Sequence, residues 1–404
     1  MYVTRPLSVL QKSAENLAAA PEGPNSGFLV IQDAESETYS MFGLKKNRTL
    51  KKLPFPQDKE VAILYPRSLG VSAGVSLPVD VIGDVSLDVA TPSDSSHSVF
   101  FIPALNHPLS SNRYYALLSH GKHKGEALTS SKEQEDDAPC CFSSGITDAK
   151  PRPLDPNDAY QQFALFPGRA SDTFSAKSAA ADGVPPKFLR KKGWTATTKT
   201  PSSFKLGAAQ GLDSQLRASL PELDSPGARA VGKWYAPFVF VKEGNSLRDQ
   251  VERSMYYEVT MEQRWEQIFK TDNRDRDKGI NSVVVDATVE TEEVFVGGSR
   301  AAWDERSAVD GVVWFKVEGG GGGGVGLRVE LVERMKWEEE RGGWVGGEGR
   351  QVKIHREEEL EGGGDWNEFG CYVLVETFNF RRMDGSLLMS YHFRHFNQLK
   401  TKWE

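Results

Sequence analysis

Cysteine is scarce in this sequence, and its placement limits the chemistry that the chain can support. Only three cysteines occur in 404 residues, namely Cys140, Cys141 and Cys371. An adjacent pair and one distant residue do not form the evenly spread set on which a disulfide framework depends. We therefore expect a reducing compartment rather than a secreted protein.

Targeting and membrane signals are also missing. The first residues, Met1–Pro6, lack the charged lead and apolar core of a signal peptide. No uninterrupted apolar run approaches the roughly 20 residues that span a bilayer as a helix. We therefore expect a soluble intracellular protein, cytoplasmic or nuclear, with no transmembrane segment.

Recognisable catalytic motifs are lacking as well. The glycine run Gly319–Gly324 is followed by Val-Gly-Leu, without the Lys-Ser/Thr that reaches phosphate and magnesium. No Gly-x-Ser-x-Gly elbow occurs either. A nucleophilic cysteine needs a base and an oxyanion donor, and the sequence indicates neither. We predict no catalytic residues and no cofactor, and we interpret the chain as non-enzymatic in preference to an enzyme.

What the sequence does contain is enough apolar material for a large core and only a mild charge. Hydrophobic residues make up 39% and aromatic residues 10%, so general disorder is excluded. The formal net charge is -7, whereas a dedicated nucleic-acid binder is normally basic. Nucleic acid is therefore not an expected partner.

Period-two patterns predict a chain dominated by antiparallel strands. In Met255–Phe269 the odd positions are apolar or glutamine, and the even positions from 258 to 266 are polar, mostly charged. A helix through Met261, Trp265 and Ile268 is the second interpretation. Near the end of the chain, Asp384-Gly385 between two strand-like runs predicts a hairpin with a type I′ turn.

Shorter segments have strand or helix character too. Leu7, Leu10, Ala14 and Leu17 recur at helical spacing and predict an amphipathic helix over about 7–19. A second helix is expected at 212–220. Short runs rich in Val, Ile, Phe and Tyr predict strands, at 27–32, 38–43, 59–65, 98–102, 113–119, 161–166, 283–296, 312–317, 371–380 and 387–396.

These patterns favour a mainly β protein, β-rich α+β, with antiparallel sheets and few short helices. We expect two parts. Residues 1–230 form a β-rich region that includes a loop-rich, basic segment at about 120–230, and residues 231–404 form an antiparallel domain packed as a sandwich.

Two histidine groups are candidate metal ligands. His120 and His123 precede Cys140 and Cys141, and zinc takes four such ligands. However, adjacent cysteines on an extended chain point to opposite sides, so a polar loop with ordinary thiols is preferred and no metal site is predicted. His392 and His395 face opposite sides of a strand, so they are not expected to form one ligand pair. Cys371 is expected to be a small core residue of a strand.

A basic stretch is the best candidate for binding. Between Lys187 and Lys205 there are six basic residues and no acidic one, with Phe188 and Trp194 interleaved. Such a pattern suits an anionic membrane surface or single-stranded nucleic acid. The alternative is a solvated loop that pairs with the region 281–365, which carries 19 acidic and 10 basic residues. The residues predicted to bind an anionic surface are Lys187, Arg190, Lys191, Lys192 and Trp194.

Several blocks of sequence resemble a plant family known only as a domain of unknown function, family 1262. The blocks lie at 1–8, 22–27, 108–115, 121–125, 233–237, 254–269 and 334–344. Relatives often have a cysteine pair just before Phe42, where this chain has Ser40-Met41, so no metal or redox role transfers from there. The resemblance implies a plant source and one shared architecture, and it implies no activity, ligand or site residues.

Two functional hypotheses follow. The preferred one is a non-enzymatic interaction module that docks onto a protein, the favoured partner, or onto an anionic lipid surface. The second is a small-molecule binder or enzyme with a pocket between the sheets, for which a deep cleft lined by His120, His123 and Cys140 would be evidence.

Overall fold

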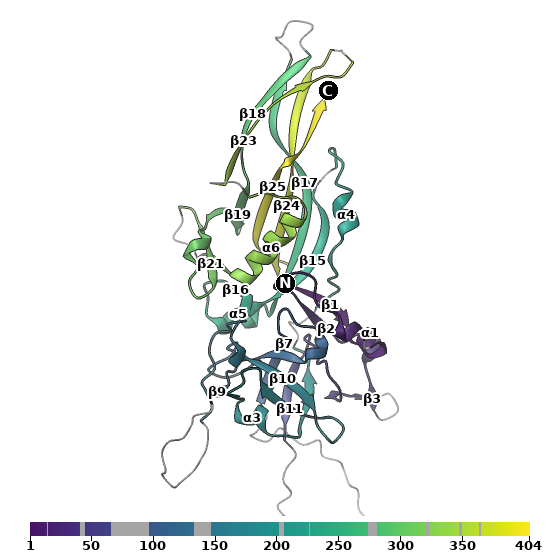
Figure 1. The fold of residues 1–404 in the computed structure, drawn as a ribbon, viewed down its shortest axis with the longest axis vertical. Helices are drawn as coiled ribbons and strands as arrows, with labels where there is room; N and C mark the ends of the chain where they lie inside the picture. Colours follow the sequence, from purple (N-terminus) through teal and green to yellow (C-terminus); the bar gives the residue numbers. More distant parts are fainter. Residues whose placement is uncertain are drawn as a thin grey trace, which may run out of the picture.

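Two main sheets follow one another along an elongated molecule. The computed structural model describes residues 1–13, 15–40, 45–65, 97–132, 147–201, 206–225, 227–273, 281–319, 323–346, 350–362 and 365–404. Within these ranges a large sheet with long strands forms the upper part, and a smaller sheet forms the lower part (Figure 1). The mainly β class predicted from the sequence is confirmed.

The large sheet, as described, has twelve strands drawn from both ends of the chain. Its order is β16-β22-β21-β20-β19-β25-β24-β17-β15-β1-β2, and β14 pairs with β15. All pairings are antiparallel except that between β1 and β2. The strands are β1 Tyr2–Pro6, β2 Gly27–Ile31, β14 Gly211–Leu212, β15 Arg229–Pro237, β16 Val241–Lys242, β17 Tyr256–Asp272, β19 Glu292–Val296, β20 Ser299–Ala302, β21 Val312–Val317, β22 Val325–Arg328, β24 Glu368–Arg382 and β25 Leu387–Trp403.

The three longest strands, β17, β24 and β25, lie side by side at the centre of this sheet. In β17 the side chains of Tyr257, Val259 and Met261 are buried, whereas Glu258 and Thr260 between them are half-exposed. This is the alternation that the sequence predicts, because successive side chains of a strand point to opposite faces. The strand prediction is confirmed, and the helical alternative is wrong.

The hairpin between β24 and β25 forms at Asp384-Gly385 as expected, but its turn type differs. Of residues 383–386, all described, only Gly385 has a positive φ, at 84°. A type I′ turn requires positive φ at both central residues, so that prediction is wrong. The Gly385 amide donates to the Arg382 carbonyl at 2.8 Å and the Arg382 amide donates to the Ser386 carbonyl at 2.9 Å. These bonds fit a type I turn followed by a left-handed glycine.

The smaller sheet closes on itself. Its order is β11-β10-β8-β7-β6-β13-β5, and an additional pairing of β11 with β13 joins the two sides. The closed sheet surrounds aromatic and aliphatic side chains that include Phe55, Phe101 and Trp194. Its strands are β5 Thr49–Leu50, β6 Glu60–Leu64, β7 His97–Pro103, β8 Arg113–Leu118, β10 Gln162–Pro167, β11 Thr173–Ser178 and β13 Trp194–Lys199.

Three two-stranded sheets and short helices complete the described structure. The two-stranded sheets are β3 Tyr39–Ser40 with β4 Lys45–Lys46, β9 Ser131–Lys132 with β12 Gly183–Val184, and β18 Ser282–Glu290 with β23 Gln351–Glu359. The helices are α1 Leu7–Lys12, α2 Glu15–Ala18, α3 Lys187–Arg190, α4 Ser214–Ala218, α5 Leu247–Arg253 and α6 Val329–Arg341, and the 3₁₀ turns are η1 Ala34–Ser36, η2 Leu109–Ser111, η3 Ala159–Gln161, η4 Phe238–Phe240 and η5 Glu305–Ser307. None of the helices within the described ranges is long and apolar enough to cross a membrane.

Two helical segments differ from the predictions. The helix expected at 7–19 is divided at Ser13, whose backbone is extended with φ of -141°, so α1 and α2 are separate. The thirteen-residue helix α6 was not predicted at all. It packs across one face of the large sheet (Figure 1) and supplies charged side chains to its interior.

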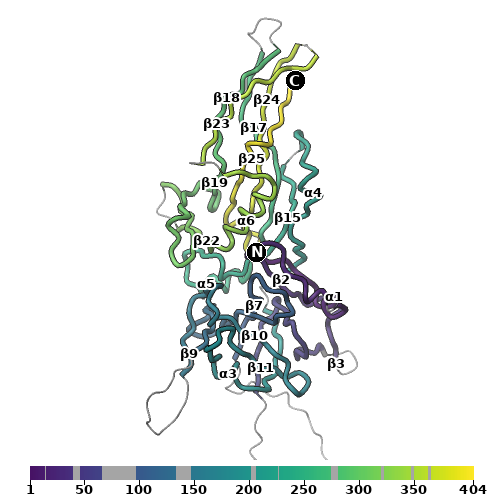
Figure 2. Tube along the Cα trace, viewed as in Figure 1, coloured from purple at the N-terminus to yellow at the C-terminus, as the bar shows by residue number. Residues whose placement is uncertain are grey.

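A second layer covers the upper end of the large sheet. The β18–β23 pair packs Val283, Val285 and Ile354 against Phe369 and Cys371 of β24. In the C-terminal part, for which a sandwich is predicted, this two-stranded sheet forms the second layer. The tube trace shows it beside the upper part of β17 and β24 (Figure 2).

The two main sheets share one hydrophobic core at their junction. In β7, Phe101 points into the closed sheet, whereas Phe100 and Ile102 pack with residues of the large sheet. Across this junction the Tyr256 hydroxyl donates to the Gln57 carbonyl at 2.9 Å. Strands β1 and β2 also join the large sheet from the N-terminal side of residue 230. The domain division near residue 230 stays a prediction.

Candidate functional site

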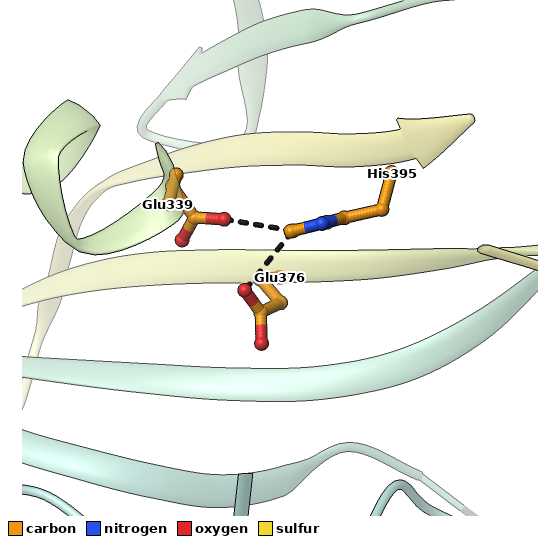
Figure 3. A group of neighbouring side chains, drawn as sticks. All are labelled: Glu339, Glu376 and His395. Carbon is orange, nitrogen blue, oxygen red and sulfur yellow. Dashed lines mark hydrogen bonds and ion pairs between the residues drawn. The ribbon is translucent and has the colours of Figure 1, made fainter. Parts of the chain in front are cut away.

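Three buried ionisable side chains meet beneath α6. Glu339 comes from α6, Glu376 from β24 and His395 from β25 (Figure 3). The His395 Nε2 atom lies 2.8 Å from Glu339 Oε2 and 3.0 Å from Glu376 Oε2. All three residues are at most 1% exposed. One imidazole nitrogen therefore bridges two carboxylates in the interior of the protein.

The fold places these side chains through simple periodicities. On α6, Glu339 follows Val332 and Met335 at the i, i+3, i+7 spacing of one helix face, which is the face turned to the sheet. On the sheet, His395 is directly opposite Leu374, and Glu376 lies two residues further along β24. Diagonal neighbours of this kind are within reach of long side chains.

Arg217 and Gln263 complete the polar cluster. The Arg217 guanidinium of α4 donates from Nε to Glu376 Oε1 at 2.9 Å and from Nη2 to Glu376 Oε2. It also donates from Nη1 to the Glu338 carbonyl in the last turn of α6 at 2.7 Å. Gln263 of β17 donates to Glu376 Oε1 at 2.8 Å and to the Arg217 carbonyl at 3.1 Å. Glu376 is thus held by charge-assisted, bidentate hydrogen bonds.

The environment shifts the pKa values of the three groups in different directions. Burial and the nearby Glu376 carboxylate raise the pKa of Glu339 to about 8. Burial opposes ionisation of Glu376, but hydrogen bonds from His395 and Arg217 outweigh it and hold the pKa well below its usual range. Burial also disfavours the imidazolium, yet hydrogen bonds to both glutamates raise the pKa of His395 to about 9. The cluster therefore retains protons at neutral pH.

The same side chains form a possible ligand set for a metal. Their ligand atoms all lie within 4.8 Å of one another, and carboxylate with imidazole suits several divalent metals. However, Arg217 occupies both oxygens of Glu376, and its Nη2 is 3.7 Å from Glu339 Oε2. A metal would have to displace the His395 proton beside this fixed positive charge. The donor set fits a shared proton better than a cation.

A cavity of about 360 Å³ adjoins the cluster. Its polar lining includes Arg217, Gln263, Arg341 and Glu376, and the rest comes from α4, the end of α6 and the sheet. Within the described residues, Nδ1 of His395 has no hydrogen-bond partner. The cavity therefore leads from the surface to a buried polar network that can hold and release protons.

The predicted basic surface lies at the lower end of the molecule, around α3 (Figure 1). Lys187, Lys191 and Lys192 are exposed, and Arg190 is half-buried. No salt bridge joins any of the four to another residue in the described ranges. The Lys187 backbone amide donates to the Asp148 carboxylate at 2.9 Å, so one acidic group lies beside the patch.

The aromatic residues of this stretch are less available than predicted. Trp194 is 0% exposed, and its Nε1 donates to the Leu189 carbonyl at 3.2 Å within the core of the closed sheet. Trp194 therefore does not belong to the binding surface, which corrects that prediction. Phe188 stacks on His97 at 4.3 Å, and the Lys191 ammonium lies 4.9 Å from the Tyr65 ring centroid.

The other sequence candidates lie apart from the buried cluster. His120 is within 2.7 Å of the Ser119 hydroxyl, and His123 is 2.6 Å from Glu126 Oε2. Cys140, Cys141 and Lys205 lie outside the described residues. Neither His120 nor His123 lines the cavity beside Arg217.

The remaining candidates are on the long strands. Cys371 is a buried residue of β24, as expected. His392 does not join His395, since the two belong to opposite faces of β25, and burial lowers the pKa of His392 to about 4.

Sequence reasoning missed the cluster because it missed α6. The signal was present: Val329, Val332 and Met335 recur at helical spacing just before the glutamates. Glycine-rich sequence on both sides of this segment is typical of loops, so the sequence does not predict a helix there. In the sequence His395 pairs most obviously with His392, and no pattern links it to Arg217, which is 178 residues away along the chain.

Comparisons with known proteins find one family model that matches part of the chain and several similar solved structures. A family model described as "Protein of unknown function (DUF1262)" matches residues 22–142, in agreement with the resemblance seen in the sequence. No curated protein matches the chain. The crystal structure of Cry35Ab1 aligns with a TM-score of 0.44 and 11% identity, over 86% of this chain and 90% of that one.

Proposed function

We propose that this chain is a non-enzymatic interaction module that docks onto an anionic lipid surface through Lys187, Arg190, Lys191 and Lys192. A plant source and an intracellular location are part of the proposal, because the family resemblance and the scarcity of cysteine favour them. The observation that carries it is that these four cations form no salt bridge within the described residues. Uncompensated cations on one face attract anionic headgroups.

The geometry argues against the intramolecular alternative. In that alternative the basic stretch pairs with the acidic stretch 281–365. Its β18–β23 sheet lies at the upper end of the molecule, and α3 lies at the lower end (Figure 1). Acidic side chains there pair locally, as Asp286 does with Lys353 at 3.1 Å and Glu358 does with Arg356. The acidic groups of the β18–β23 sheet are therefore far from the cations of α3 (Figure 1).

In the proposed docking, the α3 surface is attracted to the membrane by charge, and no aromatic ring is inserted. Trp194 is in the core, and Phe188 and Tyr65 are engaged by neighbours. Each cation near an anionic membrane contributes about 1 kcal/mol. Four cations therefore provide reversible binding that salt weakens, since the Debye length falls to about 3 Å at 1 M.

Vesicle co-sedimentation tests the proposal. The full chain should pellet with phosphatidylcholine vesicles that contain phosphatidylserine, not with pure phosphatidylcholine, and 1 M salt should release it. Replacing Lys187, Arg190, Lys191 and Lys192 by alanine should abolish pelleting. A matched control removes four exposed cations elsewhere, namely Arg306, Lys316, Lys353 and Arg356, and should pellet like the unmodified chain. Equal loss in both variants, or in neither, would contradict the assignment and favour docking onto a protein.

A second candidate function rests on the cavity beside Arg217. Its polar lining and the shifted pKa values of Glu339 and His395 support a small-molecule binder, the alternative drawn from the sequence. Native mass spectrometry with elemental analysis of protein purified from its source tests it. Extra mass that the Arg217→Ala variant loses would place this role first, and a bare chain would speak against it.

A further inference from the structure

A second cavity lies between the N-terminal helices and the closed sheet, and its walls are rich in leucine. Its volume is about 410 Å³. Leu7 and Leu10 of α1 and Leu17 of α2 form one side. Leu50 of β5 and Leu53, which follows it, form the other. This volume lies within the range of roughly 300–1,000 Å³ typical of sites for small ligands.

The leucines line a seam between two separate hydrophobic clusters. Leu7 and Leu10 are buried with Phe28 in a small cluster, whereas Leu50 and Leu53 pack against the core of the closed sheet. Leu17, Leu50 and Leu53 are only partly buried. Apolar surface therefore remains open between two cores, where an apolar chain can be covered on both sides.

The rim of this cavity carries positive charge. Three of its sixteen lining residues, Arg48, Lys51 and Lys52, are cations, and none is acidic. All three are exposed, and no salt bridge is formed by any of them within the described residues.

Two carboxylates of the loop that carries Ser36 and Thr38 are engaged elsewhere. Glu35 pairs with Lys12 at 2.6 Å, and Glu37 pairs with Lys46 and accepts a hydrogen bond from Tyr39. Neither of these two glutamates is paired with Arg48, Lys51 or Lys52. Cations above an apolar wall complement an amphiphile with an anionic head.

We infer that this cavity binds a single-chain amphiphile with an anionic headgroup, a fatty-acid carboxylate or a lysophospholipid phosphate. The alkyl chain lies between the leucines of α1, α2 and β5. The headgroup is held at the rim by Arg48, Lys51 and Lys52. Polar side chains at the same rim, such as Asn47 and Thr198, supply hydrogen-bonding groups.

This site is distinct from the basic surface of α3, although one strand links them. β13 begins at Trp194, shortly after α3, and its Thr198 lines the cavity. Four residues of a strand span about 13 Å. The inference goes beyond the docking proposal, because a dissolved amphiphile can be bound whether or not the chain attaches to vesicles.

Fluorescence of cis-parinaric acid with the full chain tests the inference. Its emission should rise and saturate, and both oleate and oleoyl lysophosphatidic acid should displace it. The two competitors distinguish carboxylate from phosphate preference. Oleyl alcohol, which has the same chain without charge, should need at least about tenfold higher concentration, the equivalent of about 1.4 kcal/mol.

Variants separate this site from the α3 surface. The charge-reversal variant R48E/K51E/K52E should weaken oleate binding about tenfold or more, and Leu17→Glu should weaken it by placing a carboxylate in the apolar wall. The control K187E/K191E/K192E should bind oleate normally while losing vesicle pelleting. Failure to saturate, equal displacement by oleyl alcohol, or unchanged oleate binding in R48E/K51E/K52E would each overturn the inference. Thermal unfolding of each variant verifies that it is folded.

Discussion

Glu376 is the residue on which the buried polar network depends. It accepts hydrogen bonds from Arg217, Gln263 and His395, from three different elements. A buried ion pair is a weak source of stability in itself, but the loss of one partner leaves the other charge uncompensated. The network therefore fixes α4 in one position on the sheet, because Arg217 must stay paired with Glu376.

Replacing Glu376 by glutamine should destabilise the protein by about 3 kcal/mol, because the Arg217 guanidinium would stay buried without its carboxylate. Urea denaturation measures this change. Glu262 on β17 is half-exposed, and Glu262→Gln is the matched control, for which less than about 0.5 kcal/mol is expected. Equal effects of the two substitutions would show that Glu376 is not the centre of the network.

The same cluster gives stability a dependence on alkaline pH. His395 has a pKa of about 9 in the folded chain against an ordinary value of 6.5, so its stabilisation is complete below pH 6.5 and is lost as pH rises through 9. Glu339, raised from 4.5 to about 8, loses stabilisation over pH 4.5 to 8. Thermal melts should show Tm falling between pH 6.5 and 9, and His395→Asn should make that fall shallower. Parallel curves for the two proteins would contradict the assignment to His395.

At the scale of elements, the strands were predictable and α6 was not. β17, β24 and β25 show period two because one face meets the core, and the burial pattern of β17 repeats the sequence pattern. The left-handed glycine of the hairpin could be placed, but the turn type depends on the backbone of Asp384, which sequence does not determine. In α6 the buried face carries Glu338 and Glu339, so the apolar stripe that identifies a helix is interrupted by charge.

The candidate site was less predictable than the fold, because its parts come from distant elements. The basic surface of α3 is continuous in sequence and could be located, although the burial of Trp194 could not. The cluster joins α4, α6, β17, β24 and β25, and only the packed sheet brings them together.

The end of α6 should be sensitive to the size of residue 342. A Cβ on Gly342 would lie 2.0 Å from Arg217 Nη2, so Gly342→Ala must displace the guanidinium from Glu376 and from the Glu338 carbonyl. We expect a loss of about 2 kcal/mol, within the usual range for breaking a buried network. Gly323→Ala is the control, since its Cβ would meet nothing within 4 Å. Similar denaturation midpoints for both variants would show that Arg217 adapts freely.

At the scale of the whole molecule, one hydrophobic core is shared by the two main sheets. Ile102 of the closed sheet packs in the same cluster as Trp234 and Tyr256 of the large sheet. A continuous core of this kind favours one cooperative unfolding unit. The cations of α3 lie at the lower end, and the acidic strands β18 and β23 lie at the upper end (Figure 1). Charge is therefore distributed unevenly along the molecule.

Ile102→Ala should therefore lower the free energy of unfolding of the whole chain by about 2–5 kcal/mol. The chain should still unfold in one transition, and the closed sheet should not melt separately. Differential scanning calorimetry measures this, and Val99→Ala, inside the closed sheet only, is the companion variant. Two separated transitions in either variant would support the division near residue 230 as a true domain boundary.

The pairing of Tyr2 with Tyr235 has a consequence for biosynthesis. At about 5–20 residues per second, roughly 10–50 s pass between synthesis of β1 and synthesis of its antiparallel partner β15. During that interval β1 has only β2 as a neighbour, and its other edge is open to any unfolded chain nearby. Strand β1 thus completes its pairing late, and one of its edges stays available to other chains until β15 has been made.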